Sequence, residues 1–274
     1  MLCNKGLSSA KICSKTGFRT KPSRRRMAPA AKAANVEQVA NALELDASFS
    51  GLADGDGQMT VAGFGSLLSE RSARTTFPEL QNFRLGKVAG WRRVFAHTAD
   101  IFYKRGIARP ETKEVGSLSL EPGVPGQEVV VSLFEVACTP ESVQLFIERE
   151  HEFKFVSVDV QTLEGQPTGR RAVICAAWND EDYKATRCPP DEWQSRWSVH
   201  GVQQVWGVPD ILPCRVYLRH CVLAARSMGP LCESSFLDST FLSDRVTTVR
   251  QHLRANPTIM DELPPPELIG RYSG

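Results

Sequence analysis

The pattern of apolar residues changes near Asn179. Before this point, short segments rich in β-branched and aromatic residues are separated by turn residues, which is typical of strands. After it, apolar residues recur with the spacing of helices. One expected helix, 140–150, interrupts the strand-rich part. This order predicts an α+β fold with a helical appendage rather than two independent domains. The expected strands are 59–62, 83–97, 101–103, 115–120, 129–136, 155–160 and 172–177.

Capping residues indicate where several helices begin. Thr139 is a suitable N-cap with Pro140 at the first helical position, and Ser69 is a suitable N-cap for a short helix. Asn179 and Asp210 have the same character. The other expected helices are 37–50, 140–150, 180–187, 210–226, 232–241 and 244–254.

The helix at 140–150 carries an acidic residue on its apolar face. Val143, Phe146 and Ile147 stand at i, i+3 and i+4, and Glu150 stands at i+7 on the same stripe. A carboxylate that loses hydration there has a raised pKa, which suits a general base or acid near neutral pH. In the alternative reading, Glu150 lies in a frayed last turn and points to water. Periodicity alone favours the alternative.

A second feature lies upstream, where an expected strand runs into Phe64-Gly65-Ser66-Leu67. Glycine and serine directly after a strand allow a sharp turn that exposes consecutive backbone N–H groups. Such groups bind a carboxylate or an oxyanion. The segment lacks the third glycine of a dinucleotide-binding loop and the Gly-Lys-Ser/Thr of a phosphate loop, which excludes both.

Together, these two features resemble the γ-glutamylcyclotransferase-like family. That family has a Tyr-Gly-Ser-Asn or Tyr-Gly-Ser-Leu loop after its first strand, matched here by residues 64–67. It also has a catalytic Glu at the end of a helix that is followed by a strand, matched here by Glu150. Residues 105–108 resemble its pocket-lining Gly-Gly-Ile-Ala stretch. The resemblance covers residues 59–178. Phe64 departs from the family's Tyr, which removes a hydroxyl and leaves the substrate open.

The resemblance implies a fold and a reaction. The fold would be a small mixed β-barrel, with 179–274 as a helical extension packed on residues 59–178. Glu150 would take a proton from the α-amino group of a γ-glutamyl substrate, whose amine would close 5-oxoproline and expel an amine or amino acid. No metal, nucleotide or other cofactor is implied. The residues expected to contact substrate are Phe64, Gly65, Ser66, Leu67, Gly106 and Ile107.

Two other functions stay open at this point. The chain could be a catalytically silent family member that binds a ligand or a partner protein in a plastid. It could also be a related amine–glutamyl enzyme that acts on a tagged small molecule. Oligomeric state and leaving group are not determined by the sequence.

The N-terminal residues differ in charge from the rest. Residues 1–36 contain nine Lys or Arg and no Asp or Glu, which leaves 24 basic against 31 acidic residues elsewhere. A basic, serine-bearing leader without an apolar segment is typical of an organellar transit peptide. We therefore expect residues 1–50 to be a transit peptide or disordered leader for the chloroplast, with mitochondrion or cytoplasm as alternatives. A basic arm that binds nucleic acid or an acidic partner is the competing interpretation.

Composition excludes or disfavours several other classes. No apolar run approaches the roughly 18 residues that span a bilayer. Trp91 with two following arginines is too small a patch for nucleic acid. No cysteine pair has C-x-x-C spacing, which makes a zinc site improbable. Arg149 and Arg105 are candidates to bind a substrate carboxylate, although surface pairing of Arg149 with Glu148 or Glu152 is the favoured expectation.

Overall fold

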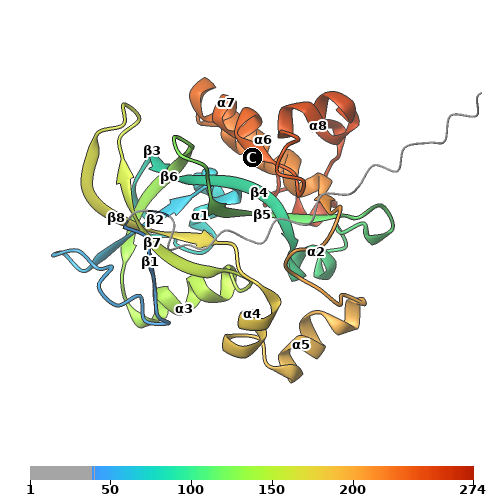
Figure 1. Cartoon of the computed structure of the whole chain (residues 1–274), viewed down its shortest axis with the longest axis horizontal. Helices are drawn as coiled ribbons and strands as arrows, with labels where there is room; N and C mark the ends of the chain where they lie inside the picture. The colour runs from blue at the N-terminus through green and yellow to red at the C-terminus, as the bar shows by residue number, and fades with distance from the viewer. Residues whose placement is uncertain (1–38, 40) are drawn as a thin grey trace, which may run out of the picture. The chain divides into compact units, whose positions relative to one another are not determined.

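The computed structural model describes residues 39 and 41–274. Most of the expected leader therefore lies outside the described residues, and its role stays a prediction. Figure 1 shows the described part as a mixed sheet with helices around it. The strands are β1 (Leu43–Glu44), β2 (Gln58–Gly63), β3 (Gln81–Ala89), β4 (Trp91–Thr98), β5 (Glu114–Pro122), β6 (Glu128–Ala137), β7 (Lys154–Gln161), β8 (Pro167–Ala176), β9 (Leu212–Pro213) and β10 (Thr240–Phe241).

Within the described residues, these ten strands form one sheet in the order β1-β7-β3-β6-β2-β8-β5-β4-β10, with β9 paired to β5. Strand β7 also pairs with β8, so that β7, β3, β6, β2 and β8 form a closed cycle. The α+β architecture is confirmed. We describe it as a large mixed sheet, part of which closes on itself, in place of the expected small barrel.

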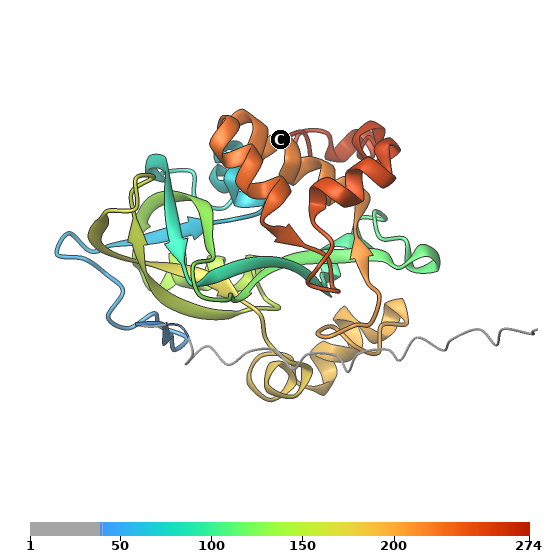
Figure 2. The ribbon, with the colours of Figure 1, turned by 45° about the horizontal axis from the view of Figure 1, so that its top comes forward.

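Helices cover the sheet on opposite sides. Figures 1 and 2 show α6, α7 and α8 grouped on one side, and α4 and α5 on the other. The helices are α1 (Glu70–Arg74), α2 (Asp100–Lys104), α3 (Pro140–Arg149), α4 (Asp180–Thr186), α5 (Pro190–Arg196), α6 (Arg215–Ser227), α7 (Pro230–Asp238) and α8 (Val249–Ala255). Short 3-10 turns are η2 (Ser66–Leu68), η3 (Pro110–Thr112), η4 (Ser198–His200), η5 (Pro257–Asp261) and η6 (Pro266–Leu268).

One part of the core lies between the sheet and α3. Phe146 of α3 packs against Phe155 of β7, with ring centroids 5.4 Å apart. Phe49 closes the same cluster, 5.1 Å from Phe155 and 6.1 Å from Phe146. These rings bury large apolar surfaces, which fixes α3 and its C-terminal end against the sheet.

The N-terminal part of the described chain is strand and turn, so the expected helix at 37–50 is wrong. Strand β1 pairs with β7, and the Leu45 N–H donates to the Phe155 carbonyl at 2.9 Å. Phe49 is 1% exposed. Residues 41–50, which fall within the expected leader, are therefore part of the folded sheet and core.

Other expected elements have different boundaries or types. The strand expected at 83–97 is two strands joined at Gly90, whose φ of +80° suits a tight turn. The strand expected at 101–103 is helix α2, because its three residues are too few to reveal a helical period. The helix expected from Asp210 begins at Arg215, because the preceding residues pair with β5 as β9.

The region after Asn179 is not purely helical. Strand β9 pairs with β5, and β10 pairs in parallel with β4. The expected helix 232–241 accordingly ends at Asp238 as α7, before β10. Helix α8 begins at Val249, five residues later than expected, behind a capping box formed by Thr248 and Gln251. The helical extension is therefore joined to the sheet by strand pairing.

Candidate active site

The turn after β2 requires glycine at two positions because neighbouring atoms approach closely. A Cβ atom on Gly63 would lie 2.5 Å from the Leu67 Cβ, and one on Gly65 would lie 2.8 Å from the Tyr217 hydroxyl. The Ser132 hydroxyl donates to the Leu67 carbonyl at 2.7 Å and fixes the turn. The chain can therefore enter η2 with Ser66 beside a cavity.

The end of α3 brings Glu150 to the same cavity. Thr139 caps the helix, with the Ser142 N–H donating to its hydroxyl at 3.2 Å. Val143, Phe146 and Ile147 are buried, as the apolar stripe predicts. Glu150 is the C-cap, and its side chain is 16% exposed. The carboxyl group at the end of α3 thus continues the buried face of the helix and lines the cavity.

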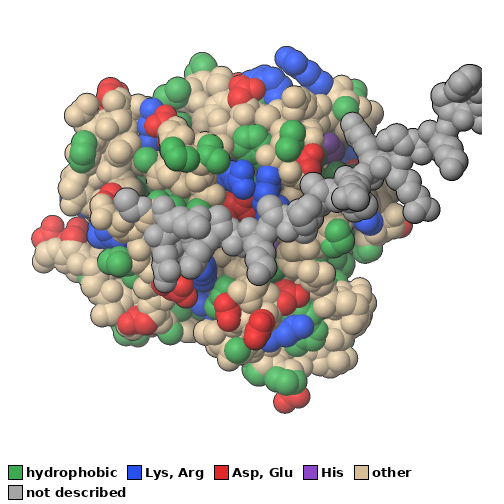
Figure 3. Space-filling view, in the orientation of Figure 1, with side chains coloured by type: hydrophobic (Ala, Val, Ile, Leu, Met, Phe, Trp, Pro, Cys, Tyr) green, Lys and Arg blue, Asp and Glu red, His purple; other side chains and the backbone are tan. Residues whose placement is uncertain are grey.

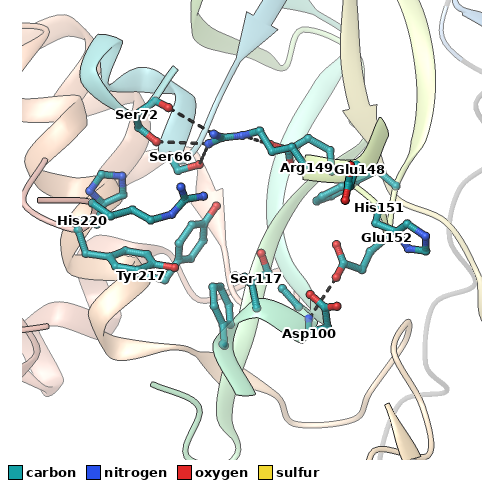
Figure 4. A pocket seen from close by; sticks show the side chains of 17 residues that line it. Ser66, Ser72, Asp100, Ser117, Glu148, Arg149, His151, Glu152, Tyr217 and His220 are labelled. Carbon is teal, nitrogen blue, oxygen red and sulfur yellow. Dashed lines mark hydrogen bonds and ion pairs between the residues drawn. The ribbon is translucent and has the colours of Figure 1, made fainter. Parts of the chain in front are cut away.

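Arg149 connects α3 to the turn after β2. Its Nε donates to Glu150 Oε1 at 2.8 Å, and its Nη2 donates to the Ser66 and Ser72 hydroxyls at 3.3 Å. Figure 4 shows the guanidinium reaching Ser66 and Ser72. The expected surface pairing of Arg149 with Glu148 or Glu152 is wrong, because hydroxyl acceptors from η2 and α1 draw the side chain inward, where it is 8% exposed.

The cavity has a volume of ≈ 80 Å³, which holds a small ligand group or several waters. Its walls come from the turn after β2, the start of α2, residues 148–153, β5, α6 and residues 271–272. The polar groups that line it include Ser66, Ser117, Glu150, Glu152, Tyr217 and Arg271.

The predicted site residues do not all reach this cavity. Ser66 and Glu150 line it. Among the described residues that line it, none of the other predicted contacts appears, because the side chains of Phe64, Leu67 and Ile107 lie in the core. Gly65 supports the turn, and Gly106 adopts φ +63° after α2. Residues at the start of α2 form the wall that 105–108 was expected to form.

Sequence reasoning missed the contribution of the C-terminal part. Tyr217 and His220 of α6 line the cavity, together with Arg271 and Tyr272. Tyr217 and His220 are three residues apart on a helix, so a shared buried face with two polar groups was a readable signal. Arg271 and Tyr272 follow no periodic segment, and their sequence gave no such signal.

Burial changes the proton affinity of the acidic groups. It raises the pKa of Glu150, against the opposing effect of the Arg149 charge. Burial and the nearby Asp100 charge raise the pKa of Glu152 to about 8. Both pKa values are therefore shifted toward neutral pH, where acid–base catalysis requires groups that can gain and lose a proton.

His220 is neutral for a related reason. Burial lowers its pKa to about 4. Its Nδ1 accepts from the Gly274 N–H at 3.0 Å, so the neutral ring carries its proton on Nε2. That Nε2 is buried beside the cavity, and the Ser66 carbonyl is its nearby acceptor.

The cavity has two electrostatic sides. After burial, the charges of Arg149 and Arg271 lower the pKa of His220, and the Arg149 charge lowers the pKa of Arg271. Arg271 has no carboxylate ion pair among the described residues. Glu150, Glu152 and Asp100 supply carboxyl groups, and Figure 4 shows Glu152 and Asp100 away from Ser66 and His220. This arrangement complements a ligand that carries both an ammonium and a carboxylate group.

No protein-family model and no curated protein matches this chain. Among solved structures, similar ones include an uncharacterized protein from Homo sapiens and a protein described as a gamma-glutamyl cyclotransferase. For each, the TM-score is 0.42, the identity is 14%, and the alignment covers 75% of this chain and 99% of the other. These values describe a likeness in the course of the backbone alone.

Two further observations concern the described residues. They contain no cluster of three or more His, Cys, Asp or Glu placed to hold a metal ion. No helix among them is long and apolar enough to cross a membrane. On the face drawn in Figure 3, basic and acidic side chains are interspersed.

Proposed function

We propose that this chain is a γ-glutamylcyclotransferase-like enzyme that releases 5-oxoproline from a γ-glutamyl amine or amino acid. The observation that carries the proposal is the partly buried Glu150 carboxyl, linked through Arg149 to Ser66 in one cavity. The same cavity holds a second guanidinium, that of Arg271. These groups complement the α-amino and α-carboxylate groups that every γ-glutamyl substrate carries.

The reaction follows from the placement of these charges. The substrate α-carboxylate lies against Arg149 and Arg271, and its α-ammonium lies against Glu150. Glu150 takes a proton, and the freed amine attacks the γ-carbonyl carbon of the same molecule to close a five-membered ring. Because the reaction is intramolecular, the protein contributes chiefly by fixing the geometry.

The developing oxyanion requires donors, and the turn after β2 supplies them. The Ser66 N–H begins η2 and therefore has no helical acceptor, and Ser66 lines the cavity. The family's Tyr is Phe64 here. Two tyrosines line this cavity: the Tyr272 hydroxyl accepts from Arg105 Nη1 at 2.9 Å, and the Tyr217 hydroxyl lies beside Gly65. We propose that Tyr217 provides the hydroxyl that Phe64 lacks.

The proposal is tested by incubating the purified chain with a panel of γ-glutamyl amines and amino acids and measuring 5-oxoproline. Glu150→Gln keeps the size of the side chain but removes the base, so release is expected to fall by about 10²-fold or more. Glu181→Gln, an exposed acid on α4, is the matched control. A wild-type chain that binds these compounds and releases no 5-oxoproline is instead a binding module.

We also propose that residues 1–50 include a chloroplast-targeting segment. The support is their basic, acid-free composition up to residue 36. A fluorescent fusion of residues 1–50 is expected to enter plastids, and a fusion that stays in the cytosol contradicts this.

A further inference from the structure

The cavity contains a second buried carboxyl group with an unusual set of partners. Glu152 is 5% exposed and lines the same cavity as Glu150. Its Oε1 accepts from the Asp100 N–H at 3.1 Å, at the start of α2, as Figure 4 shows. Among the described residues, no group donates to its Oε2 and no cation pairs with it. One carboxyl oxygen of Glu152 is therefore available to a ligand.

Two nearby cations, Lys104 and Arg196, pair with Asp100 and not with Glu152. Asp100 Oδ2 binds Lys104 Nζ at 2.6 Å and Arg196 Nη1 at 2.8 Å. Asp100 is thus held as an anion next to Glu152. Burial disfavours an ionised Glu152 carboxyl, and the Asp100 charge acts in the same direction. No ion pair among the described residues offsets these two effects at Glu152.

The other charged groups around Glu152 come from several elements. Glu150 adds a second negative charge from the end of α3. Arg187 after α4 is the nearby cation, but it donates to the His151 and Phe153 carbonyls instead of to Glu152. Tyr183 of α4 and Cys175 of β8 are neutral, since burial raises the pKa of each. The pKa of Glu152 is accordingly raised to about 8.

Glu150 and Glu152 therefore differ in their partners within one cavity. Glu150 receives a hydrogen bond from a guanidinium, which favours the carboxylate. Glu152 receives a backbone N–H and faces an anion. Two carboxyl groups whose surroundings differ in this way can divide the roles of base and acid.

We infer that Glu152 is the general acid that protonates the leaving nitrogen, while Glu150 is the base for the attacking nitrogen. The inference rests on the proposed function. Glu150 takes one proton from the α-ammonium, and the amine forms the new N–C bond at the γ-carbon. The Glu152 O–H then gives its proton to the leaving nitrogen as the old C–N bond breaks. The extra proton on the ring nitrogen restores Glu152, and Glu150 returns its proton to solvent.

The loss of rate when a general acid is removed depends on the basicity of the leaving group, because a weakly basic amine needs less protonation to leave. γ-Glutamyl-ethylamide and γ-glutamyl-2,2,2-trifluoroethylamide have similar sizes, but the fluorinated amine is far less basic and needs less protonation to leave. Glu152→Gln in the full chain is expected to lower kcat for the ethylamide by about 10²-fold and for the trifluoroethylamide much less. KM is expected to change little for either, because Glu152 does not hold the amino-acid head.

The controls separate this inference from the function on which it rests. Glu150→Gln is expected to lower both reactions equally, and Glu181→Gln neither. If Glu152→Gln lowers kcat equally for both amides, or does not lower it at all, the inference is overturned while the cyclotransferase activity stands. A wild type that releases 5-oxoproline from neither amide overturns the proposed function, and this inference with it.

A measurement on the wild-type protein covers the case in which Glu152→Gln fails to fold. kcat for the ethylamide is expected to fall as pH rises through about 8, when Glu152 loses its proton. kcat for the trifluoroethylamide is expected to fall much less. Identical pH profiles for the two amides would overturn the inference.

Discussion

Glu150 and Glu152 are two residues apart, yet their carboxyl groups have different partners: a guanidinium donates to Glu150, and a backbone N–H donates to Glu152. An acidic residue on an apolar helix stripe was sufficient to identify Glu150 as a candidate. Nothing in the sequence singled out Glu152, since its raised pKa depends on burial and on Asp100, a residue 52 positions away. Charge states of this kind arise from tertiary contacts, so single residues predict them poorly.

The raised pKa of Glu152 also predicts a pH dependence of stability. Below pH 4.5 the carboxyl is protonated in both folded and unfolded chains, whereas up to about pH 8 only the folded chain retains the proton. The unfolded chain then binds fewer protons, so the free energy of unfolding falls as pH rises. Relative to wild type, Glu152→Gln is expected to gain roughly 2–4 kcal/mol between pH 5 and pH 8. Urea titrations at pH 5 and pH 8 measure this. The same change in the free energy of unfolding between the two pH values for both proteins would contradict it.

Arg271 offers a test of substrate binding. Its guanidinium lines the cavity without a carboxylate partner among the described residues. Arg271→Ala is expected to raise KM by about 10-fold or more and to change kcat little, since the α-carboxylate is held equally before and during the reaction. Steady-state kinetics measure this split. Arg254→Ala, an exposed arginine on α8, is the control, and a loss confined to kcat speaks against the assignment.

At the level of elements, the sequence predicted those whose limits are set locally. Helix α3 has its cap, its proline and its apolar stripe within eleven consecutive residues, and it was placed correctly. Helix α6 was given the wrong start because β9 depends on a partner strand nearly a hundred residues earlier. The cavity shows the same difference. Local sequence patterns drew attention to Ser66 and Glu150, which line it, whereas Tyr217 and Arg271 reach it only through long-range packing.

The turn after β2 and helix α6 are expected to be coupled. Gly65→Ala places a Cβ 2.8 Å from the Tyr217 hydroxyl and is expected to destabilise the fold by roughly 1–3 kcal/mol. Tyr217→Phe removes that hydroxyl, so the double variant is expected to lose less than the sum of the single variants. Urea denaturation of the three variants measures the coupling. Additive losses would show that the approach of α6 to the turn is unimportant.

At the level of the whole described chain, the C-terminal part supplies both structure and site. It adds β9 and β10 to the sheet through β5 and β4, and it supplies one wall of the cavity. A chain that ends at Trp178 is expected to expose apolar surface and to be insoluble or rapidly proteolysed. Limited proteolysis and size-exclusion chromatography test this. A soluble truncated chain with cooperative unfolding would mean that residues 59–178 are independent of the extension.

The two outermost strands of the sheet, β1 and β10, are only two residues long each. Short outer strands leave few unpaired backbone groups to recruit another molecule, which protects a protein from aggregation through its sheet edges. Strand β1 is one of these two edge strands, and it lies inside residues 1–50, the segment expected to be processed. Cleavage beyond Glu44 would remove β1 and expose the edge of β7. Cleavage beyond Phe49 would also remove the Phe49 ring from its contacts with Phe146 and Phe155. A soluble mature protein is therefore one that is cut before β1.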